Sequence, residues 1–234
     1  MLDFDGTLSN IAKTPARARL PKSNERILQV LARYVPIAIV SGRSLNDIKR
    51  KIGIKGIVYA GNHGLEWEIK NKKGAVKIPS GQTLTIAKAH AQLCKLVESY
   101  HGSLLENKSL SLSLHYRLLK KKFVKKFLSD AWQILSPFLK KRLLKISHGK
   151  KVVEVRPALL WDKGRMVNFL RKKLGFSLVP IYIGDDATDE DAFKALRTGI
   201  TIKNGQNQNS QAVYFCHSAK QINLFLRWLL KELK

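Results

Sequence analysis

Carboxylates follow two short apolar runs of this sequence, and their spacing is typical of a catalytic site. The chain opens with MLDFDGTL, so Asp3 and Asp5 stand two residues apart, before a Gly-Thr turn. Far downstream the apolar run VPIYIG leads into Asp185-Asp186, with Asp189 three residues further on. If the two runs are neighbouring strands, these acids form one cation-binding site. Mg²⁺ prefers such oxygen ligands and also binds phosphate oxygens, so the pattern favours phosphoryl transfer.

Three further polar residues are expected at the same site, and two of them, Ser41 and Lys163, would face a phosphate ester. Ser41 and Arg43 follow the apolar run 35–40, and Lys163 starts a segment with helical periodicity. Ligands of an open parallel sheet bind at the carboxyl ends of its strands, so we expect these residues to gather near the acids. A lysine in the first helical turn opposes the helix dipole and is better placed if it holds an anion. An exposed lysine with no ligand is the simpler alternative for Lys163.

Apolar periodicity at both ends of the chain predicts an α/β core with a parallel sheet and helices on its faces. The predicted strands are 1–4, 35–40, 56–60, 179–183 and 199–202. The predicted helices are 24–34, 45–52, 163–174, 190–196 and 221–233. We assign 1–81 and 156–234 to this core.

The pattern in the middle of the chain, 82–155, predicts an inserted α+β domain. Helices are predicted at 84–100 and 121–135, the second one ended by Ser136-Pro137. Strands are predicted at 103–105, 110–116, 143–147 and 152–156. Apolar residues alternate with Ser and His between 110 and 116, so one face of this sheet is expected to be polar.

Composition restricts the function classes. The 43 Lys and Arg against 17 Asp and Glu give a net charge of +26, which attracts anions and favours non-specific binding to polyanions. The basic residues are spread over most segments, so we expect no specific nucleic-acid partner. No apolar run is long enough to cross a bilayer, and no secretory signal is seen. Two distant cysteines fit a reduced, cytoplasmic protein. We expect a monomer without a membrane partner.

Four motifs in this order, DFDGTL, VSGR, the lysine of DKG and GDDATDEDAF, resemble the haloacid-dehalogenase (HAD) superfamily of phosphatases. The resemblance implies a Rossmannoid core with an inserted cap, and Asp3 as a nucleophile that forms an aspartyl-phosphate. Asp5 would be the general acid and base. The phosphate would be oriented by Thr7, Ser41 and Lys163. Mg²⁺ would be held by Asp3, the Asp5 carbonyl and Asp185, with Asp186 and Asp189 as ligands or close by.

Finer motifs, GNHGLE, ENK, LHYR and EVRP, are similar to those of trehalose-6-phosphate phosphatases. That resemblance implies hydrolysis of this sugar phosphate to trehalose and phosphate, the last step of trehalose biosynthesis. It also implies that sugar hydroxyls are bound by two sets of side chains, Glu106, Lys108 and Glu154 from the cap and Arg43, Asn62 and His63 from the core. A phosphatase for another small-molecule sugar phosphate, such as sucrose phosphate or glucosylglycerol phosphate, is the alternative within this class.

The first strand departs from the family pattern. Only Met1 and Leu2 precede Asp3, whereas family members carry several apolar residues before the nucleophile. A strand usually has about five or six residues, so we expect a start further upstream, a truncated chain or a degraded copy. An inactive homologue that binds polyanions through its basic surface is therefore the alternative from a different class.

Overall fold

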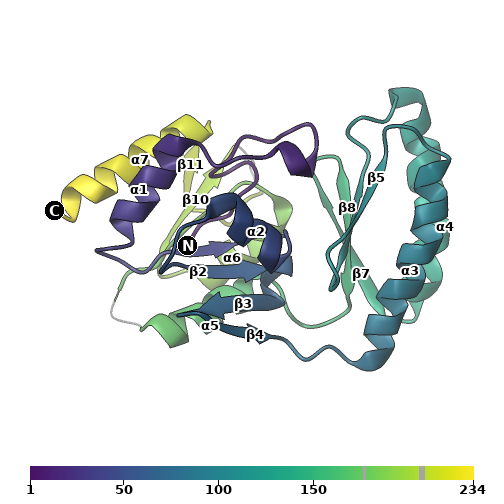
Figure 1. The fold of residues 1–234 in the computed structure, drawn as a ribbon, viewed down its shortest axis with the longest axis horizontal. Coiled ribbons are helices and arrows are strands. Elements are labelled where there is room, and N and C mark those ends of the chain that lie inside the picture. The colour runs from purple at the N-terminus through teal and green to yellow at the C-terminus, as the bar shows by residue number, and fades with distance from the viewer. Residues whose placement is uncertain (176–177, 206–208) are drawn as a thin grey trace. The chain divides into compact units, whose positions relative to one another are not determined.

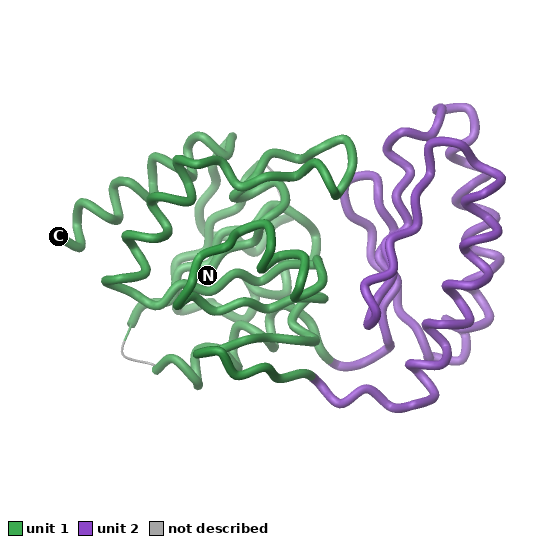
Figure 2. The backbone as a smooth tube through the Cα atoms, in the orientation of Figure 1, with its two compact units in different colours: residues 1–75, 161–234 green, residues 76–160 purple. Residues whose placement is uncertain are grey.

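The computed structural model describes residues 1–175, 178–205 and 209–234. The chain divides into two compact units, which Figure 2 shows in different colours. Unit 1 comprises Met1–Ala75 and Trp161–Lys234, and unit 2 comprises Val76–Leu160. Across the described ranges, no helix combines the length and the apolar character that crossing a membrane requires.

Unit 1 is built on a mainly parallel sheet. Its parallel strands are β1 (Ala38–Val40), β2 (Val58–Gly61), β9 (Ile181–Gly184), β10 (Ile200–Asn204) and β11 (Tyr214–Cys216). The antiparallel hairpin of β3 (Glu66–Ile69) and β4 (Lys72–Ala75) extends it beyond β2. Leu2 joins its two halves, with parallel bridges to Ile39 of β1 and Ile183 of β9. The strand predicted at 1–4 is thus only a bridge, but this bridge places Asp3 at the carboxyl edge of the sheet.

Helices cover both faces of this sheet (Figure 1). Ile39 and Ile183 pack into a core with α1 (Lys22–Leu31), α2 (Leu45–Ile52) and α7 (Ala219–Glu232). The neighbouring residues Val40 and Tyr182 point to the other face, where they pack with α5 (Lys163–Leu174) and α6 (Glu190–Ala195). This alternation is the period of two expected of strands that are buried on both faces. Short 3₁₀ helices occupy Pro15–Arg17, Asn62–Gly64 and Ala187–Asp189.

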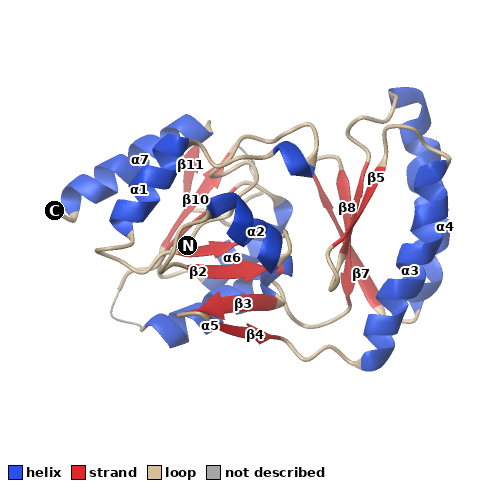
Figure 3. Ribbon diagram, in the orientation of Figure 1, coloured by secondary structure: helices blue, strands red, loops and turns tan. Residues whose placement is uncertain are grey.

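Unit 2 has helices on one face of an antiparallel sheet (Figure 3). Its elements in chain order are α3 (Ser80–Glu98), β5 (Leu104–Asn107), β6 (Leu112–His115), α4 (Lys121–Lys140), β7 (Leu144–Gly149) and β8 (Val152–Pro157). The strands lie in the order β5-β6-β8-β7. Leu93 of α3, Phe127 of α4 and Val155 of β8 are fully buried in its core. The α/β class and the α+β character of the insert are as the sequence predicts.

Two further details differ from the sequence prediction. Helix α4 does not end at Pro137 but continues to Lys140. Pro137 and Gln133, whose carbonyl loses its helical partner, are both exposed, so water can satisfy that carbonyl, while Phe138 and Leu139 pack on the unit's core. The β3–β4 hairpin and β11 were not predicted, because they are short and β4, with the sequence KKGA, lacks the β-branched residues typical of strands.

Candidate active site

A lysine and three carboxylates form a buried cluster at the carboxyl edge of the unit 1 sheet. Asp3 follows the Leu2 bridge, Asp185 follows β9, and oxygens of Asp3, Asp185 and Asp189 lie within 4.8 Å of one another. The ammonium of Lys163 lies 2.7 Å from Asp3 Oδ1 and 2.7 Å from Asp189 Oδ1. Lys163 is the first residue of α5, whose N-cap Asp162 accepts a hydrogen bond from the Arg165 amide. Lys163, the cation predicted at this helix start, therefore binds anionic groups, and these are carboxylates of the protein itself.

Asp189 is saturated with hydrogen bonds. Its Oδ1 accepts from Lys163 and from the hydroxyl of Tyr182, both at 2.7 Å. Its Oδ2 accepts from the backbone amides of Asp185 (3.0 Å) and Asp186 (2.9 Å). A carboxylate with four donors shapes the loop after β9 and fixes the lysine. Sequence reasoning missed Tyr182, whose only signal was a hydroxyl within an apolar strand.

The cluster contains three carboxylates and one ammonium, which contacts Asp3 and Asp189, so the charges of these four side chains do not balance. Burial raises the pKa of Asp3 well above its usual range, and Asp189 and Asp185 add to the rise, although Lys163 opposes it. Burial alone would raise the pKa of Asp189 as well, but Lys163, Tyr182 and a backbone amide lower it. Burial alone would lower the pKa of Lys163, but Asp189 and Asp3 raise it well above the ordinary value. An oxygen-binding divalent cation would offset the excess negative charge beside Asp3, so the residues present fit such a metal.

The turn after Asp3 lets Asp185 approach the backbone. Gly6 has φ +84°, and a Cβ added there would lie 2.1 Å from Asp185 Oδ2. Thr7 donates its hydroxyl to Asp185 Oδ1 at 3.3 Å, and the side-chain amide of Asn204 donates to the Gly6 carbonyl at 2.6 Å. The two acidic loops are thus built against each other. The carboxylate of Asp186 accepts a hydrogen bond from the backbone amide of the next residue, Ala187, at 2.8 Å.

Asp5 is paired with Arg43 instead of joining the cluster. The guanidinium binds both carboxylate oxygens, through Nε at 2.6 Å and Nη2 at 2.7 Å. The Arg43 side chain is 6% exposed, whereas that of Asp5 is 40% exposed. Burial would lower the pKa of Arg43, but hydrogen bonds to Asp5 and Asp47 raise it above its ordinary value, so the ion pair is firmly held.

The loops after β1 and β2 are tied together next to this pair. The backbone amide of Asn62 donates to the Arg43 carbonyl at 2.6 Å, and that of His63 donates to the Ser41 carbonyl at 2.9 Å. Asn62 and His63 both have positive φ, 49° and 58°. A Cβ on Gly42 would lie 2.7 Å from the His63 ring, so glycine is needed for this packing. The structure therefore brings Ser41, predicted for the phosphate, next to Arg43, Asn62 and His63, which were predicted for the sugar.

The three remaining predicted residues lie on the sheet of unit 2 or, for Lys108, directly after its strand β5. Glu154 of β8 accepts from the Ser113 hydroxyl at 2.9 and 2.8 Å and from the Lys108 ammonium at 3.4 and 3.3 Å. Glu106 of β5 lies 3.2 Å from His115 Nε2. Cross-strand register places Glu106 opposite Ser113 and Ser113 opposite Glu154. These side chains therefore form a row of charged and hydroxyl groups across the sheet.

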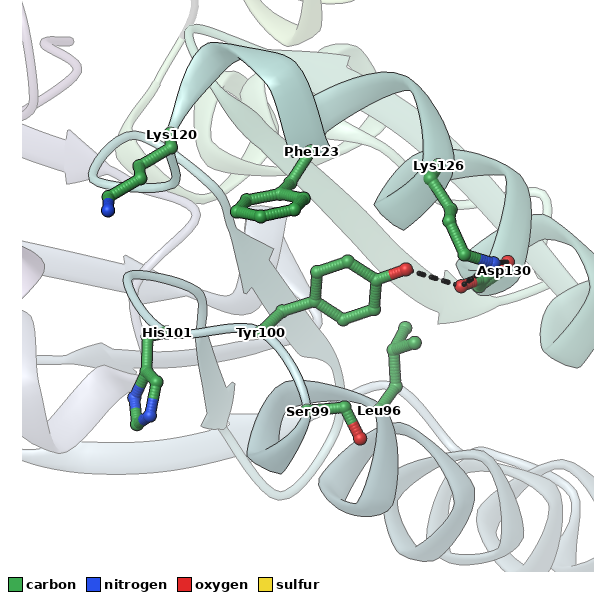
Figure 4. Close-up of a pocket in the computed structure, with 8 residues that line it drawn as sticks. All are labelled: Leu96, Ser99, Tyr100, His101, Lys120, Phe123, Lys126 and Asp130. Atoms are coloured by element: carbon green, nitrogen blue, oxygen red, sulfur yellow. Dashed lines mark hydrogen bonds and ion pairs between the residues drawn. The ribbon is translucent and has the colours of Figure 1, made fainter.

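Unit 2 also contains a cavity of about 630 Å³, which Figure 4 shows in close-up. In it the Tyr100 hydroxyl donates to Asp130 at 2.6 Å, and Lys126 pairs with the same carboxylate at 3.3 Å. The lining residues are Leu96, Ser99, Tyr100, His101, Lys120, Phe123, Lys126 and Asp130. None of the predicted sugar-binding residues is among them.

Comparison with known proteins decides the family. The family model described as trehalose-phosphatase matches residues 1–228. The chain belongs to the trehalose-phosphatase family. It is 35% identical over 248 residues to the probable trehalose-phosphate phosphatase D of Arabidopsis thaliana, and 34% identical over 253 residues to trehalose-phosphate phosphatase B of the same plant. These matches cover 98% of this chain and 66% and 65% of the relatives, so the chain spans about two thirds of their length.

Solved structures support the fold of this trehalose-phosphatase family member. The C-terminal domain of trehalose-6-phosphate phosphatase from C. albicans superposes with a TM-score of 0.86 at 22% identity, covering 98% of this chain and 90% of that domain. A trehalose-6-phosphate phosphatase related protein gives a TM-score of 0.82 at 24% identity, covering 99% and 96% of the two chains. A haloacid dehalogenase-like hydrolase from Bacteroides thetaiotaomicron gives 0.67 at 14% identity, covering 97% of each chain. The HAD-like fold is therefore established.

Proposed function

We propose that this chain hydrolyses trehalose 6-phosphate to trehalose and phosphate in a Mg²⁺-dependent reaction. The observation that carries the proposal is the buried cluster of Asp3, Asp185, Asp189 and Lys163 in a chain of the trehalose-phosphatase family. Relatives at about one-third identity are named trehalose-phosphate phosphatases, which supports the choice of sugar.

In the proposed reaction Asp3 is the nucleophile. Its carboxylate oxygen forms a bond to phosphorus, the bond from phosphorus to the sugar oxygen breaks, and Asp5 gives that oxygen a proton. Water then attacks the phosphorus of the aspartyl-phosphate while Asp5 takes its proton, which releases phosphate and restores Asp3. The buried contact of Lys163 with Asp3 Oδ1 keeps the nucleophile oriented, and its ammonium is placed to attract a phosphate oxygen. Thr7 and Ser41 would supply hydroxyl groups to the same phosphate.

The metal would be held by Asp3, the Asp5 carbonyl and Asp185. When bound, Mg²⁺ supplies positive charge that neutralises phosphate oxygens and the excess carboxylate charge. We assign Asp189 to positioning, because its four hydrogen bonds already engage both oxygens. Asp186, whose side chain caps Ala187, would lie outside the metal's ligands.

Sugar recognition is proposed for the polar row of unit 2. Glu106, Lys108 and Glu154 combine acceptors and a donor that suit neighbouring hydroxyl groups of a disaccharide. A site built to hydrogen-bond hydroxyl groups rejects analogues that lack them, because its buried polar groups are then left unpaired. For Asn62 and His63 of unit 1, a role in sugar binding is proposed from the family resemblance alone. In this proposal unit 2 is the cap of the enzyme.

Phosphate release tests the proposal. Trehalose 6-phosphate, sucrose 6-phosphate and glucosylglycerol phosphate are each incubated with the chain, with Mg²⁺ and with EDTA, beside an Asp3→Asn control. We expect release from trehalose 6-phosphate at least about a hundredfold faster than from the others, a difference of about 2.7 kcal/mol in transition-state binding. Release that is equally fast from all three would refute the choice of sugar. Release by Asp3→Asn, or in EDTA, would refute the chemistry.

A further inference from the structure

Arg43 is a buried side chain that nothing in the proposed chemistry yet explains. It lies three residues after β1, and its fork binds both oxygens of Asp5, the more exposed partner. An arginine that binds a carboxylate through two parallel hydrogen bonds fixes the plane of that carboxylate as well as its position. The orientation of Asp5 is therefore set by the orientation of this guanidinium.

The guanidinium of Arg43 is itself held in place by contacts with groups other than Asp5. Its Nη1 donates to Asp47 Oδ2 at 2.7 Å, and its Nη2 also donates to the Pro15 carbonyl at 3.0 Å. Its carbon lies 5.4 Å from the centroid of the Phe4 ring, within range of a cation–π contact. With the two bonds to Asp5, four hydrogen bonds engage a group that has five N–H donors. This arrangement favours an action through Asp5 over direct binding of substrate.

Asp47 is anchored in the first turn of α2. The Ser44 hydroxyl caps this helix by accepting from the Asp47 amide at 3.3 Å, which fixes the backbone at Asp47. The Asp47 side chain is 15% exposed, and its other oxygen accepts from the exposed Arg50 at 2.7 Å. From Asp47 through Arg43 to Asp5 the exposed fraction runs 15%, 6% and 40%. The chain of ion pairs thus starts in a helix terminus and ends at an accessible carboxylate.

We propose that Asp47 and Arg43 are positioning residues for Asp5, which hold its carboxyl in the orientation that protonates the leaving oxygen. This inference rests on the proposed function, in which Asp5 is the general acid. Stability alone is a poor reason for such an arrangement, since the cost of burying charges consumes much of their attraction. Positioning gives the arrangement a reason, because general acid catalysis requires the donor to lie within hydrogen-bond reach of the leaving oxygen.

The dependence of the rate on the leaving group tests this role. A sugar oxygen needs a proton in order to leave, whereas 4-nitrophenolate leaves readily without one. Single-turnover phosphorylation rates are measured by rapid quench for trehalose 6-phosphate and for 4-nitrophenyl phosphate, at saturating Mg²⁺. For Asp47→Asn we expect a rate about tenfold lower with the sugar phosphate, a part of the 10²–10⁴-fold contribution typical of a general acid. We expect less than about a twofold change with the aryl phosphate, because that step does not use the acid.

Two further variants complete the experiment. Arg50→Ala removes the exposed partner of Asp47 and leaves the contact with Arg43, so both rates should match the wild type. Arg43→Lys keeps the charge but not the fork, so it should reproduce the selective loss even if Asp47→Asn does not fold. Equal slowing of both substrates, or of neither, in the folded variants would overturn the inference. If the wild type releases phosphate from neither substrate, the proposed function fails and the inference fails with it.

Discussion

Replacing Lys163 by methionine tests how strongly the acidic cluster depends on the ammonium that contacts two of its carboxylates. The ammonium lies 2.7 Å from both Asp3 and Asp189, which are 5% and 0% exposed. Removing one partner of a buried ion pair leaves an uncompensated charge and costs about 3–5 kcal/mol. In a chain of this length each kcal/mol lowers Tm by about 2–4 °C, so Lys163→Met should lower it by about 6–20 °C.

The loss of stability in Lys163→Met should also depend on pH. Burial and the neighbouring acids raise the pKa of Asp3 above its ordinary value of 3.8, and Lys163 is the cation that opposes this rise. Without Lys163 the folded-state pKa of Asp3 rises further. A carboxyl whose pKa is raised by folding stabilises the protein below its unfolded pKa, and that contribution is lost as pH rises through the folded pKa. The deficit of the variant relative to wild type should therefore be larger at pH 8 than at pH 5.

Urea unfolding followed by circular dichroism measures both effects. Lys172→Met is the matched control, because it makes the same substitution at an exposed position of α5 and should change stability by less than about 0.5 kcal/mol. Adding Asp189→Asn to Lys163→Met should recover part of the loss, since it removes one of the two uncompensated charges. If Lys163→Met is as stable as Lys172→Met at both pH values, the electrostatic reasoning for this cluster is wrong.

Two other predictions concern residues next to the cluster. Gly6→Ala should weaken Mg²⁺ binding by about tenfold or more in calorimetric titration, because its Cβ would displace Asp185, and such supporting contacts are typically worth 10–100-fold in metal affinity. The matched control is Gly53→Ala, because Gly53 also has a positive φ but open space around it, and this variant should leave Mg²⁺ affinity unchanged. Equal Mg²⁺ affinities of the two variants would contradict the steric argument. Burial would raise the pKa of Glu190, but hydrogen bonds from the Gln211 amide, Lys203 and Ser210 lower it below its ordinary value. The ionised Glu190 therefore stabilises the folded protein, and this contribution should be lost as pH falls through the lowered pKa. Glu190→Gln should therefore lose less stability than wild type between pH 7 and pH 3 in urea unfolding, and an identical loss would contradict this assignment.

The sequence was sufficient to predict the elements that carry the acidic cluster. Helix α5, which begins with Lys163, begins and ends at the predicted residues, and Asp3 and Asp185 meet because carboxyl ends of parallel strands share one edge of a sheet, although the strand predicted before Asp3 is only a bridge. The polar face of the unit 2 sheet also followed from alternation, since Ser113 and Glu154 lie side by side on neighbouring strands.

Side-chain contacts that depend on the exact backbone geometry of a loop or strand could not be predicted in this way, even between residues close in sequence. Tyr182 lies in an apolar run, and only the parity of β9 decides that its hydroxyl reaches Asp189. Asp47 was not among the predicted site residues, because an acid in the first turn of a helix has many other uses, and only the conformation of the loop before α2 brings it to Arg43 four residues earlier. Helix α4 passes Pro137 because tertiary packing outweighs the local signal for a helix end.

Acid quenching during turnover tests most directly that Asp3 is a covalent nucleophile for trehalose 6-phosphate. The chain is mixed with ³²P-labelled substrate and Mg²⁺, quenched within milliseconds, and digested so that labelled peptides can be identified by mass spectrometry. The proposed mechanism predicts label on the peptide that contains Asp3, released by hydroxylamine and absent from Asp3→Asn. Release of phosphate at the wild-type rate with no labelled peptide at any time, or by Asp3→Asn itself, would contradict it.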